Sequence, residues 1–384
     1  MRVGMDVLHR RHFDLLRGKR VGVLSHQAAL TADGATSAQL LRHALGKRLV
    51  ALYGPEHGFF GQSGAGEQTH TRLHPDWGIP VYSLYGERRK PSQEMLSDVD
   101  AVVCDLQDLG VRCYTYLATL RNMLEACVEA GVEVLVTDRP IPLAQTVDGP
   151  MPEPSLMSFV APCPVPLVYG MTPAESASWM KTMLYPEARL TVVPMEGWQR
   201  KDAAWDGTRP AFMPPSPGIK TWESAATYAA TVFAEALPGI DCGRGTNLAF
   251  RVLGAPWLHA EKFCERMTRH HLAGVSFHPC RYMVASGGYA GRELDGIRLT
   301  VTQAARFKPA EVSLALLRAL AEHYGQPRVW HHKGARAKWF DLLYGTSETR
   351  KQLQAGKPLD AIAAVWSRER RGFAAARAAA LLYA

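Results

Sequence analysis

A glutamate and a histidine stand side by side in a glycine-bracketed turn, Gly54-Pro55-Glu56-His57-Gly58. A carboxylic acid held protonated beside an imidazole can donate to a leaving oxygen, the step that glycoside hydrolysis requires. The glycines that follow can bring backbone close to a ligand. The competing interpretation is structural, with Glu56 capping a following helix and His57 hydrogen-bonding the turn. Glu56 and His57 are therefore the first candidates for catalysis.

The elements around this turn indicate an α/β fold. Apolar runs predict buried strands at residues 20–24, 49–53, 101–104 and 132–136. The clearest helix lies between the last two runs, with apolar side chains from Leu117 to Val128 on one face and Gly131 as its stop. Strands and helices that alternate in this way predict a parallel sheet covered on both faces.

A polar cluster follows each predicted strand. The clusters are Ser25-His26-Gln27, Glu56-His57, Asp105-Leu106-Gln107-Asp108 and Asp138-Arg139. Because the carboxyl ends of parallel strands meet at one edge of the sheet, these side chains should converge. We therefore expect Asp105 and Gln107 to bind sugar hydroxyls, with Arg112 and Tyr114 close by.

Structural roles compete with these assignments. Asp108 and its neighbours are also consistent with a capped helix start that contains an internal ion pair. Asp138-Arg139 can equally be a structural pair, although a guanidinium at that position also suits a ligand carboxylate through bidentate hydrogen bonds.

Size and charge limit the remaining possibilities. A chain of 384 residues exceeds the usual limit for one core, so two domains are expected. The formal charge of +8 favours anionic partners in general. The basic residues are scattered, and short clusters such as Glu87-Arg88-Arg89-Lys90 indicate a solvated surface, so no nucleic-acid partner is expected.

The cysteines bear on the cellular compartment. Seven cysteines at wide, irregular spacing form no C-x-x-C pair and predict reduced, mostly buried thiols. The sequence as it stands begins without a signal-like apolar stretch, and no run reaches the length of a membrane span. These features predict a cytoplasmic protein; the alternative is export if a leader has been removed.

The sequence predicts a domain division near residue 150. Prolines are dense between residues 140 and 166, which predicts a segment that crosses between domains. We expect residues 1–150 to form a Rossmann-like domain and residues 151–384 a smaller α+β domain. Within the second part, strands are predicted at 190–193 and 296–301 and helices at 313–324 and 359–382.

Several common chemistries lack their motifs. The chain has no G-x-G-x-x-G after a strand, no phosphate-binding G-x-x-x-x-G-K-[ST] loop and no G-x-S-x-G elbow. His70 and His74 have helical spacing, but Pro75 and Asp76 favour a loop, so we expect no metal site there. No cofactor is expected.

Several segments in register resemble the DUF1343 family, which includes exo-β-N-acetylmuramidases. The resemblance covers nearly the whole chain, and the segments that carry it are Gly54–Phe59, Ala65–Glu67, Val81–Gly86, Asp105–Arg112, Asp138–Pro140, Gly170–Thr172, Gly197–Arg200, Pro215–Pro217, Gly243–Thr246 and Gly254–Trp257. It implies a Rossmann-like amino-terminal domain, a smaller carboxy-terminal domain and a cleft between them. It also implies release of N-acetylmuramic acid from the non-reducing ends of peptidoglycan fragments or muropeptides, without a redox cofactor.

The resemblance also implies roles for residues. Glu56 takes the place of the catalytic acid, with His57 as its neighbour. Glu235, in Phe233-Ala234-Glu235-Ala236, is the second carboxylate, and Glu67 is the alternative to it. Whether the reaction retains or inverts configuration stays open at this stage.

Two further roles follow from position in the family pattern. Tyr169 stands where a histidine usually precedes Gly170-Met171-Thr172, and the resemblance implies that it binds the substrate. The lactyl carboxylate of the sugar is expected on Arg112, Arg139 or Arg244.

The chain departs from the family pattern around Glu235. Ala236-Leu237-Pro238 replaces Gly-Thr-Asn, which removes polar groups near the expected sugar pocket. This departure motivates two alternatives: a non-catalytic binder of anionic sugars or muropeptides, and a hydrolase of another bond.

Overall fold

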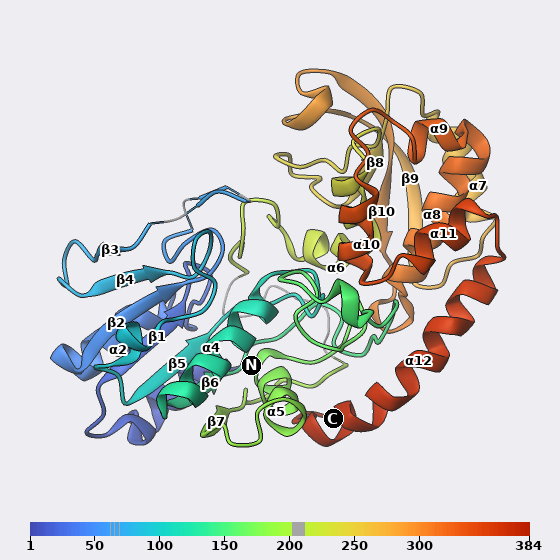
Figure 1. Cartoon of the computed structure of the whole chain (residues 1–384). Helices are drawn as coiled ribbons and strands as arrows, with labels where there is room; N and C mark the ends of the chain where they lie inside the picture. Colours follow the sequence, from blue (N-terminus) through green and yellow to red (C-terminus); the bar gives the residue numbers. More distant parts are fainter. Residues whose placement is uncertain (62, 65, 69, 202–211) are drawn as a thin grey trace.

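The computed structural model describes all residues except 62, 65, 69 and 202–211. Its described part contains a seven-stranded sheet in the order β3-β4-β2-β1-β5-β6-β7 and a three-stranded sheet in the order β8-β10-β9. The two sheets belong to separate lobes of the molecule (Figure 1). The predicted fold class, a Rossmann-like α/β domain with a smaller α+β domain, is confirmed.

The first sheet is parallel except for β3, which runs antiparallel to β4. Every residue of β1 and of β5 is buried, as a sheet with both faces covered requires. The strands of this sheet are β1 (Val21–Ser25), β2 (Leu49–Gly54), β3 (Arg72–Leu73), β4 (Pro80–Ser83), β5 (Ala101–Asp105), β6 (Glu133–Thr137) and β7 (Leu190–Val193).

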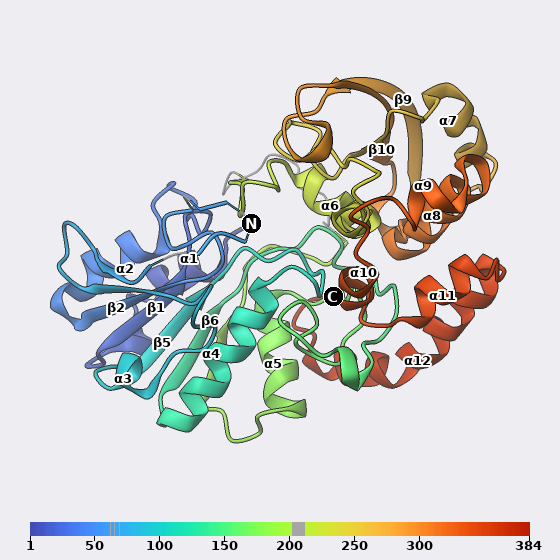
Figure 2. The same ribbon diagram turned by 45° about the horizontal axis from the view of Figure 1, so that its top comes forward.

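Helices cover both faces of the first sheet, because successive strand residues point to opposite sides. Val23 packs in one core with Leu41 of α2, whereas Val102 packs in another with Leu124 of α4. Figure 2 shows α4 and α5 on the same face. These helices are α1 (Gly4–Arg10), α2 (Ser37–Leu45), α3 (Gln93–Leu96), α4 (Tyr116–Ala130) and α5 (Pro173–Met183).

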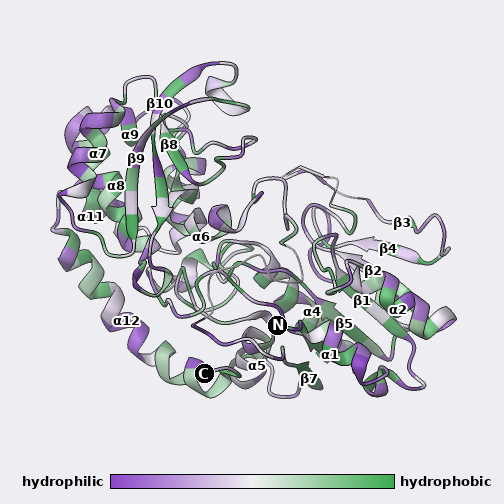
Figure 3. Cartoon of the chain, turned by 180° about the vertical axis from the view of Figure 1, so that it is seen from behind, coloured by the Kyte–Doolittle hydropathy of each residue, from purple (hydrophilic) through white to green (hydrophobic). Residues whose placement is uncertain are grey.

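The predicted strands of the first 150 residues are confirmed within one residue at each end. The predicted helix is α4, and Gly131 ends it in the left-handed conformation at φ 67°. In Figure 3, the hydrophobic residues of β5 are coloured green.

The expected domain boundary at residue 150 needs correction. Strand β7 pairs in parallel with β6, so the first sheet is completed well beyond that residue. The proline-dense segment leaves the first sheet after β6 and returns to it through α5. On its way it contacts the second lobe, where the Glu153 N–H donates to the Gly345 carbonyl at 2.7 Å. It is therefore an excursion between the lobes, and the crossing to the second lobe comes later.

The second lobe is built on the antiparallel strands β8 (Val252–Gly254), β9 (Val275–Met283) and β10 (Glu293–Val301). The predicted strand at 296–301 is part of β10, and the predicted helix at 313–324 is part of α8. The helices of this lobe are α6 (Trp222–Thr231), α7 (Ala260–Thr268), α8 (Pro309–Tyr324), α9 (Gln326–Val329), α10 (Ala337–Tyr344) and α11 (Glu348–Gln354).

Helix α12 (Leu359–Ala380) runs from the second lobe back to the first, and both chain ends lie near α5 and β7 (Figure 1). This confirms the predicted terminal helix. Among the described residues, no helix combines the length and the apolarity that crossing a bilayer requires.

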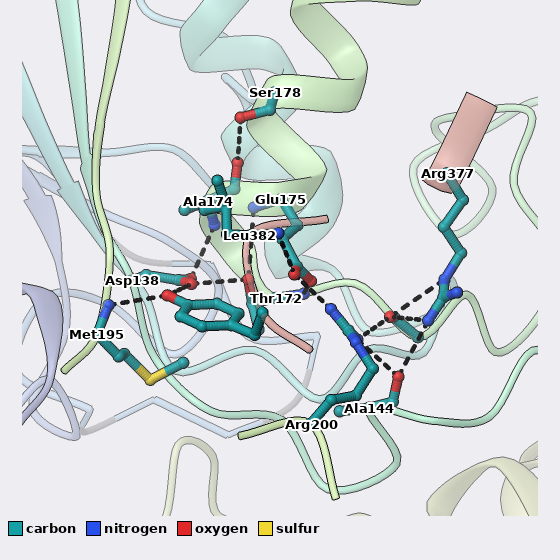
Figure 4. A network of polar contacts seen from close by, with 12 residues as sticks. Asp138, Ala144, Thr172, Ala174, Glu175, Ser178, Met195, Arg200, Arg377 and Leu382 are labelled. Carbon is teal, nitrogen blue, oxygen red and sulfur yellow. Dashed lines mark hydrogen bonds and ion pairs between the residues drawn. The ribbon is translucent and has the colours of Figure 1, made fainter. Parts of the chain in front are cut away.

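Two arginines, buried Arg200 and half-buried Arg377, attach the end of α12 to the first lobe (Figure 4). The Arg377 and Arg200 guanidinium groups each donate to the Gly170 carbonyl at 2.8 Å. Arg200 also forms an ion pair with buried Glu175, and Glu175 accepts from the Leu382 N–H at 2.9 Å. The last residues of the chain are thus part of the hydrogen-bonded interior of the first lobe.

Asp138 lies at the centre of a second group of these bonds. It is fully buried and accepts from the Thr172 hydroxyl at 2.8 Å, the Ala174 N–H at 2.9 Å and the Tyr383 hydroxyl at 2.5 Å. Burial raises the pKa of Asp138 to about 7 despite these donors. Its carboxyl group therefore holds the chain terminus against α5.

We expect Tyr383→Phe to destabilise the protein by about 1 to 3 kcal/mol, because it removes a donor from a buried carboxyl group. Tyr185→Phe is the matched control: its hydroxyl also donates to a carboxylate, that of Glu125, but at a partly exposed site. We expect the control to cost less than about 1 kcal/mol. Urea unfolding of both variants measures the difference, and equal losses would contradict a structural role for the Tyr383 bond.

Candidate active site

A cavity of about 670 Å³ lies between the two lobes and is lined by residues from both. This volume is typical of sites that hold a small molecule. The first lobe contributes the turn after β2 and the segment before α4, and the second contributes residues 234–244 and the loop after β9. Five of the side chains predicted from the sequence line it: Glu56, His57, Tyr114, Glu235 and Arg244.

The turn after β2 presents Glu56 to the cavity. Glu56 is 8% exposed, and one carboxylate oxygen accepts from the Gly66 N–H at 3.0 Å. The other oxygen accepts from the Thr115 hydroxyl at 2.7 Å. Burial raises the pKa of the neighbouring Tyr85, and the charge of Glu56 adds to this shift. No helix lies between Glu56 and β3 among the described residues. Helix capping therefore does not describe Glu56.

The His57 side chain hydrogen-bonds the backbone of the loop that follows the same turn. Its backbone is left-handed, with φ 73°, which is rare for a residue with a side chain. Its Nδ1 lies 3.0 Å from the Ser63 carbonyl, which can only accept, so the Nδ1 atom carries the proton. Burial lowers the pKa of His57 and outweighs the opposing charge of Glu56, so the ring is neutral at pH 7.

Glu235 approaches from the second lobe, on the short 3-10 helix Val232–Ala236. Its carboxylate forms an ion pair with Arg244, and the Arg336 guanidinium donates to its backbone carbonyl. Burial raises the pKa of Glu235, the charge of Arg244 opposes the shift, and the charge of Glu56 adds to it. The charge of Glu56 thus acts on the ionisation of Glu235 across the cavity.

Aromatic side chains form part of the cavity wall, together with the two carboxylates. Tyr114 is 6% exposed, and its ring packs edge-on to that of Tyr228 at a centroid distance of 6.0 Å. The Cys113 thiol lies beside the Tyr228 hydroxyl, and Cys242 lines the same cavity as a second buried thiol. Aromatic faces and small apolar groups of this kind suit the faces of a sugar ring.

Three other residues that the sequence analysis expected at the substrate lie outside the cavity lining. Asp105 and Arg139 are buried and form an ion pair behind the sheet edge, with Nη2 and Oδ2 at 3.0 Å. Gln107 donates to the Asp108 and Pro140 carbonyls at 3.2 and 2.8 Å. None of the three lines the cavity. Their polar atoms satisfy the buried backbone and each other, which corrects the expectation that they bind sugar.

The Tyr169 prediction also needs correction. Tyr169 is fully buried, and its hydroxyl donates to Asp108 at 2.5 Å. Burial raises the pKa of Asp108 to about 6. Asp138, described above, is equally internal. Glu67 is exposed outside the lining residues, where its carboxylate accepts from the Gly64 N–H at 2.7 Å.

Arg112 was expected near the ligand but lies fully buried behind the cavity. Its guanidinium donates to the Pro150 and Val165 carbonyls at 2.9 Å each and to the Tyr344 carbonyl at the end of α10. Burial lowers the pKa of Arg112 to about 10. These donors are committed to main-chain carbonyls from both lobes, so Arg112 is a structural residue.

The polar cluster after β1, Ser25-His26-Gln27, lies outside the cavity lining and hydrogen-bonds neighbouring segments. His26 accepts from the Gln107 N–H at 2.9 Å, and Gln27 donates to the Pro214 carbonyl at 3.0 Å. The Tyr116 hydroxyl donates to the Pro215 carbonyl at 2.7 Å. These bonds position the segment that places Ser216 in the cavity wall.

Sequence reasoning overlooked three residues that bear on the site. Thr115 donates to Glu56, and Tyr85, which lies inside the Val81–Gly86 segment of the family resemblance, lines the cavity beside it. Arg89 is exposed, as its basic cluster predicted, and also lines the cavity. In the described part of the chain, no group of three or more histidine, cysteine, aspartate or glutamate side chains has an arrangement that could hold a metal ion.

This arrangement defines a class of protein: a two-lobed α/β protein with two carboxylates facing one cavity, as glycoside hydrolases have. The chain belongs to the NamZ (DUF1343) family. Residues 21–223 match the family model "Exo-beta-N-acetylmuramidase NamZ, N-terminal" and residues 226–383 match its C-terminal counterpart.

Individual relatives agree with this assignment. The chain is 34% identical over 384 residues to the peptidoglycan β-N-acetylmuramidase NamZ of Bacillus subtilis strain 168, covering all of this chain and 91% of that protein. It is similar to a DUF1343 family protein of known structure from Bacteroides fragilis, with 31% identity, a TM-score of 0.92 and coverage of 100% and 99%. A second such protein from B. fragilis, at 24% identity, TM-score 0.76 and coverage of 100% and 98%, shares the fold.

Two substitutions should move the pKa of Glu235 in opposite directions. Arg244→Gln removes the positive charge that lowers this pKa, so the pKa should rise; Glu56→Gln removes the negative charge that raises it, so the pKa should fall. Titration of carboxyl carbons by NMR measures both shifts. Arg244→Lys keeps the charge and is the control. An unchanged pKa in Glu56→Gln would mean that the two carboxylates are not coupled.

Proposed function

We propose that this chain is an exo-acting β-N-acetylmuramidase that releases N-acetylmuramic acid from the non-reducing ends of peptidoglycan fragments. The match extends over both family models and the full length of the chain. The observation that carries the proposal is the placement of Glu56 and Glu235 on opposite lobes, both facing one cavity. Hydrolysis of a glycosidic bond needs two carboxyl groups that flank the bond.

In this proposal Glu56 is the proton donor to the glycosidic oxygen. The Gly66 N–H and the Thr115 hydroxyl each hold one carboxyl oxygen in place, which preorganises the group for proton transfer. Glu235 acts as nucleophile or as general base, and Arg244 fixes its orientation. Separations of about 5 to 5.5 Å between the groups favour retention, and about 6.5 to 9.5 Å favour inversion with a water between them.

His57 would contribute as a neutral ring. With the proton on Nδ1 directed to Ser63, Nε2 has a free lone pair that can accept from a sugar hydroxyl. Burial, the largest influence on this ring, keeps it uncharged at pH 7. His57 thus serves to position the turn and the sugar.

We also propose a cytoplasmic location. Six of the seven cysteines are buried free thiols, and Cys280 is partly exposed. Free thiols in this number suit a reducing compartment. Fractionation of the native host tests this, and activity recovered from the medium would contradict it.

Glu56→Gln should reduce the release of N-acetylmuramic acid by about 10²- to 10⁴-fold, because an amide cannot donate the proton that the leaving oxygen needs. The substrate is a MurNAc-GlcNAc disaccharide, with GlcNAc-GlcNAc as the comparison, and released monosaccharide is measured. Glu87→Gln, at an exposed site outside the cavity, is the control and should leave turnover unchanged.

The outcomes separate the alternatives. Binding of the disaccharide without released sugar from the wild-type protein would indicate a non-catalytic binder. Full activity after treatment with chelators would exclude a metal-assisted hydrolase. Undiminished activity of Glu56→Gln would show that the acid is a different residue.

The pH profile can assign the role of Glu235. If Glu235 is the base, kcat/KM rises through its pKa on the acidic side, and Arg244→Gln should shift this acidic limb to higher pH. If Glu235 is instead the acid, the same variant should shift the alkaline limb to higher pH. Glu235→Gln should remove whichever limb belongs to this residue, and two intact limbs would contradict any role in proton transfer.

A further inference from the structure

Among the residues that the structure describes, three arginines line the cavity, and two of them already have acceptors. Arg244 forms the ion pair with Glu235, and Arg336 donates to the Glu235 backbone carbonyl. Arg89 is different: in the described part of the chain, no side-chain or backbone acceptor contacts its guanidinium group. The guanidinium of Arg89 therefore remains available to a ligand.

Arg89 is nevertheless held in position. Its guanidinium carbon lies 4.5 Å from the centroid of the Phe159 ring and 5.9 Å from that of Tyr85. The Asn122 side chain donates to the Arg89 carbonyl at 2.8 Å and fixes the backbone. A guanidinium supported on aromatic faces loses little further freedom when it binds a ligand.

Tyr85 links Arg89 to the catalytic end of the cavity. Burial raises the pKa of Tyr85 to about 12, the charge of Glu56 adds to this shift, and the charge of Arg89 opposes it. The Arg89 guanidinium lies against the Tyr85 ring, and Tyr85, Arg89 and Glu56 all line the same cavity.

Three carboxylates and three guanidinium groups of the described residues line the cavity, so what matters for the substrate is which guanidinium group has no acceptor. Glu56, Glu235 and Asp241 line it, and Arg244 forms an ion pair with Glu235. Asp241 accepts from the Tyr282 hydroxyl and the Gly243 N–H, which carry no charge. Among the described lining residues, Arg89 is the guanidinium without an acceptor, so it can meet the charge of an anionic sugar.

We propose that Arg89 binds the carboxylate of the lactyl group of the terminal sugar and so determines specificity for muramic acid over glucosamine. This inference rests on the proposed function. The lactyl ether and the scissile bond lie on the same sugar ring, so that ring can place one at Arg89 and the other at Glu56. Arg112 and Arg139, expected in this role from the sequence, have their donors committed inside the protein.

The test compares binding and turnover in Arg89→Gln, Arg89→Lys and the control Arg88→Gln. Arg88 is an exposed neighbour in the same basic cluster and does not line the cavity. Calorimetry measures the Kd for N-acetylmuramic acid and for N-acetylglucosamine. Kinetics measure kcat and KM with a muramic-acid glycoside.

Arg89→Gln should weaken binding of N-acetylmuramic acid by about 10- to 100-fold, the usual effect of losing a hydrogen-bonded ion pair with a ligand. Binding of N-acetylglucosamine should change little. Arg89→Lys should recover part of the loss, since lysine keeps the charge but not the bidentate geometry. KM should rise more than kcat falls, and Arg88→Gln should behave as wild type.

The binding arm keeps this inference separate from the proposed activity. If the wild-type protein binds N-acetylmuramic acid but releases none, and Arg89→Gln still weakens binding selectively, the activity is wrong and the role of Arg89 stands. If Arg89→Gln binds both sugars as wild type does, the role of Arg89 is overturned, whatever the turnover. Equal losses for both sugars would also overturn it, because they would show general support of the cavity.

Discussion

The candidate site depends on a fixed relation between the two lobes, because Glu56 and Glu235 come from different ones. The buried guanidinium of Arg112 provides the central connection, with hydrogen bonds to the carbonyls of Pro150, Val165 and Tyr344. Burying an unpaired charge is costly, so these carbonyls must stay in place around it. A rotation of one lobe against the other would separate the charge from its acceptors and the two glutamates from each other.

Burial also distinguishes the two glutamates. Glu56 lies in the turn after the buried strand β2 and accepts hydrogen bonds from Gly66 and Thr115. Glu235 sits on a short helix opposite, where burial raises its pKa and one arginine restrains the shift. Two carboxyl groups in unlike surroundings can take unlike roles at a single pH, which is the requirement for acid and base in one site.

The sequence predicted the sheet well but only part of the site, and the polar clusters show why. Apolar runs report burial directly, so the central strands and α4 were found within a residue or two. Polar residues at strand ends report only that a polar atom is needed there. Asp105, Arg139 and Asp138 satisfy buried backbone and one another, whereas Glu56 faces the cavity. The sequence did not indicate Arg89, because the Phe159 ring that its guanidinium packs on is distant in sequence. Only the fold brings the two residues together at the cavity.

The end of the chain shows that the lobes are not independent units. The family models divide between residues 223 and 226, yet α12 and the residues after it return to the first lobe. Tyr383 donates to Asp138, and the Leu382 N–H donates to Glu175, so the first lobe lacks buried hydrogen-bond donors without the C-terminal segment. Because this segment follows the second lobe in the sequence, its bonds to the first lobe form a second connection between the lobes. The geometry between Glu56 and Glu235 is therefore maintained by bonds at Arg112 beside the cavity and by bonds at the chain terminus far from it.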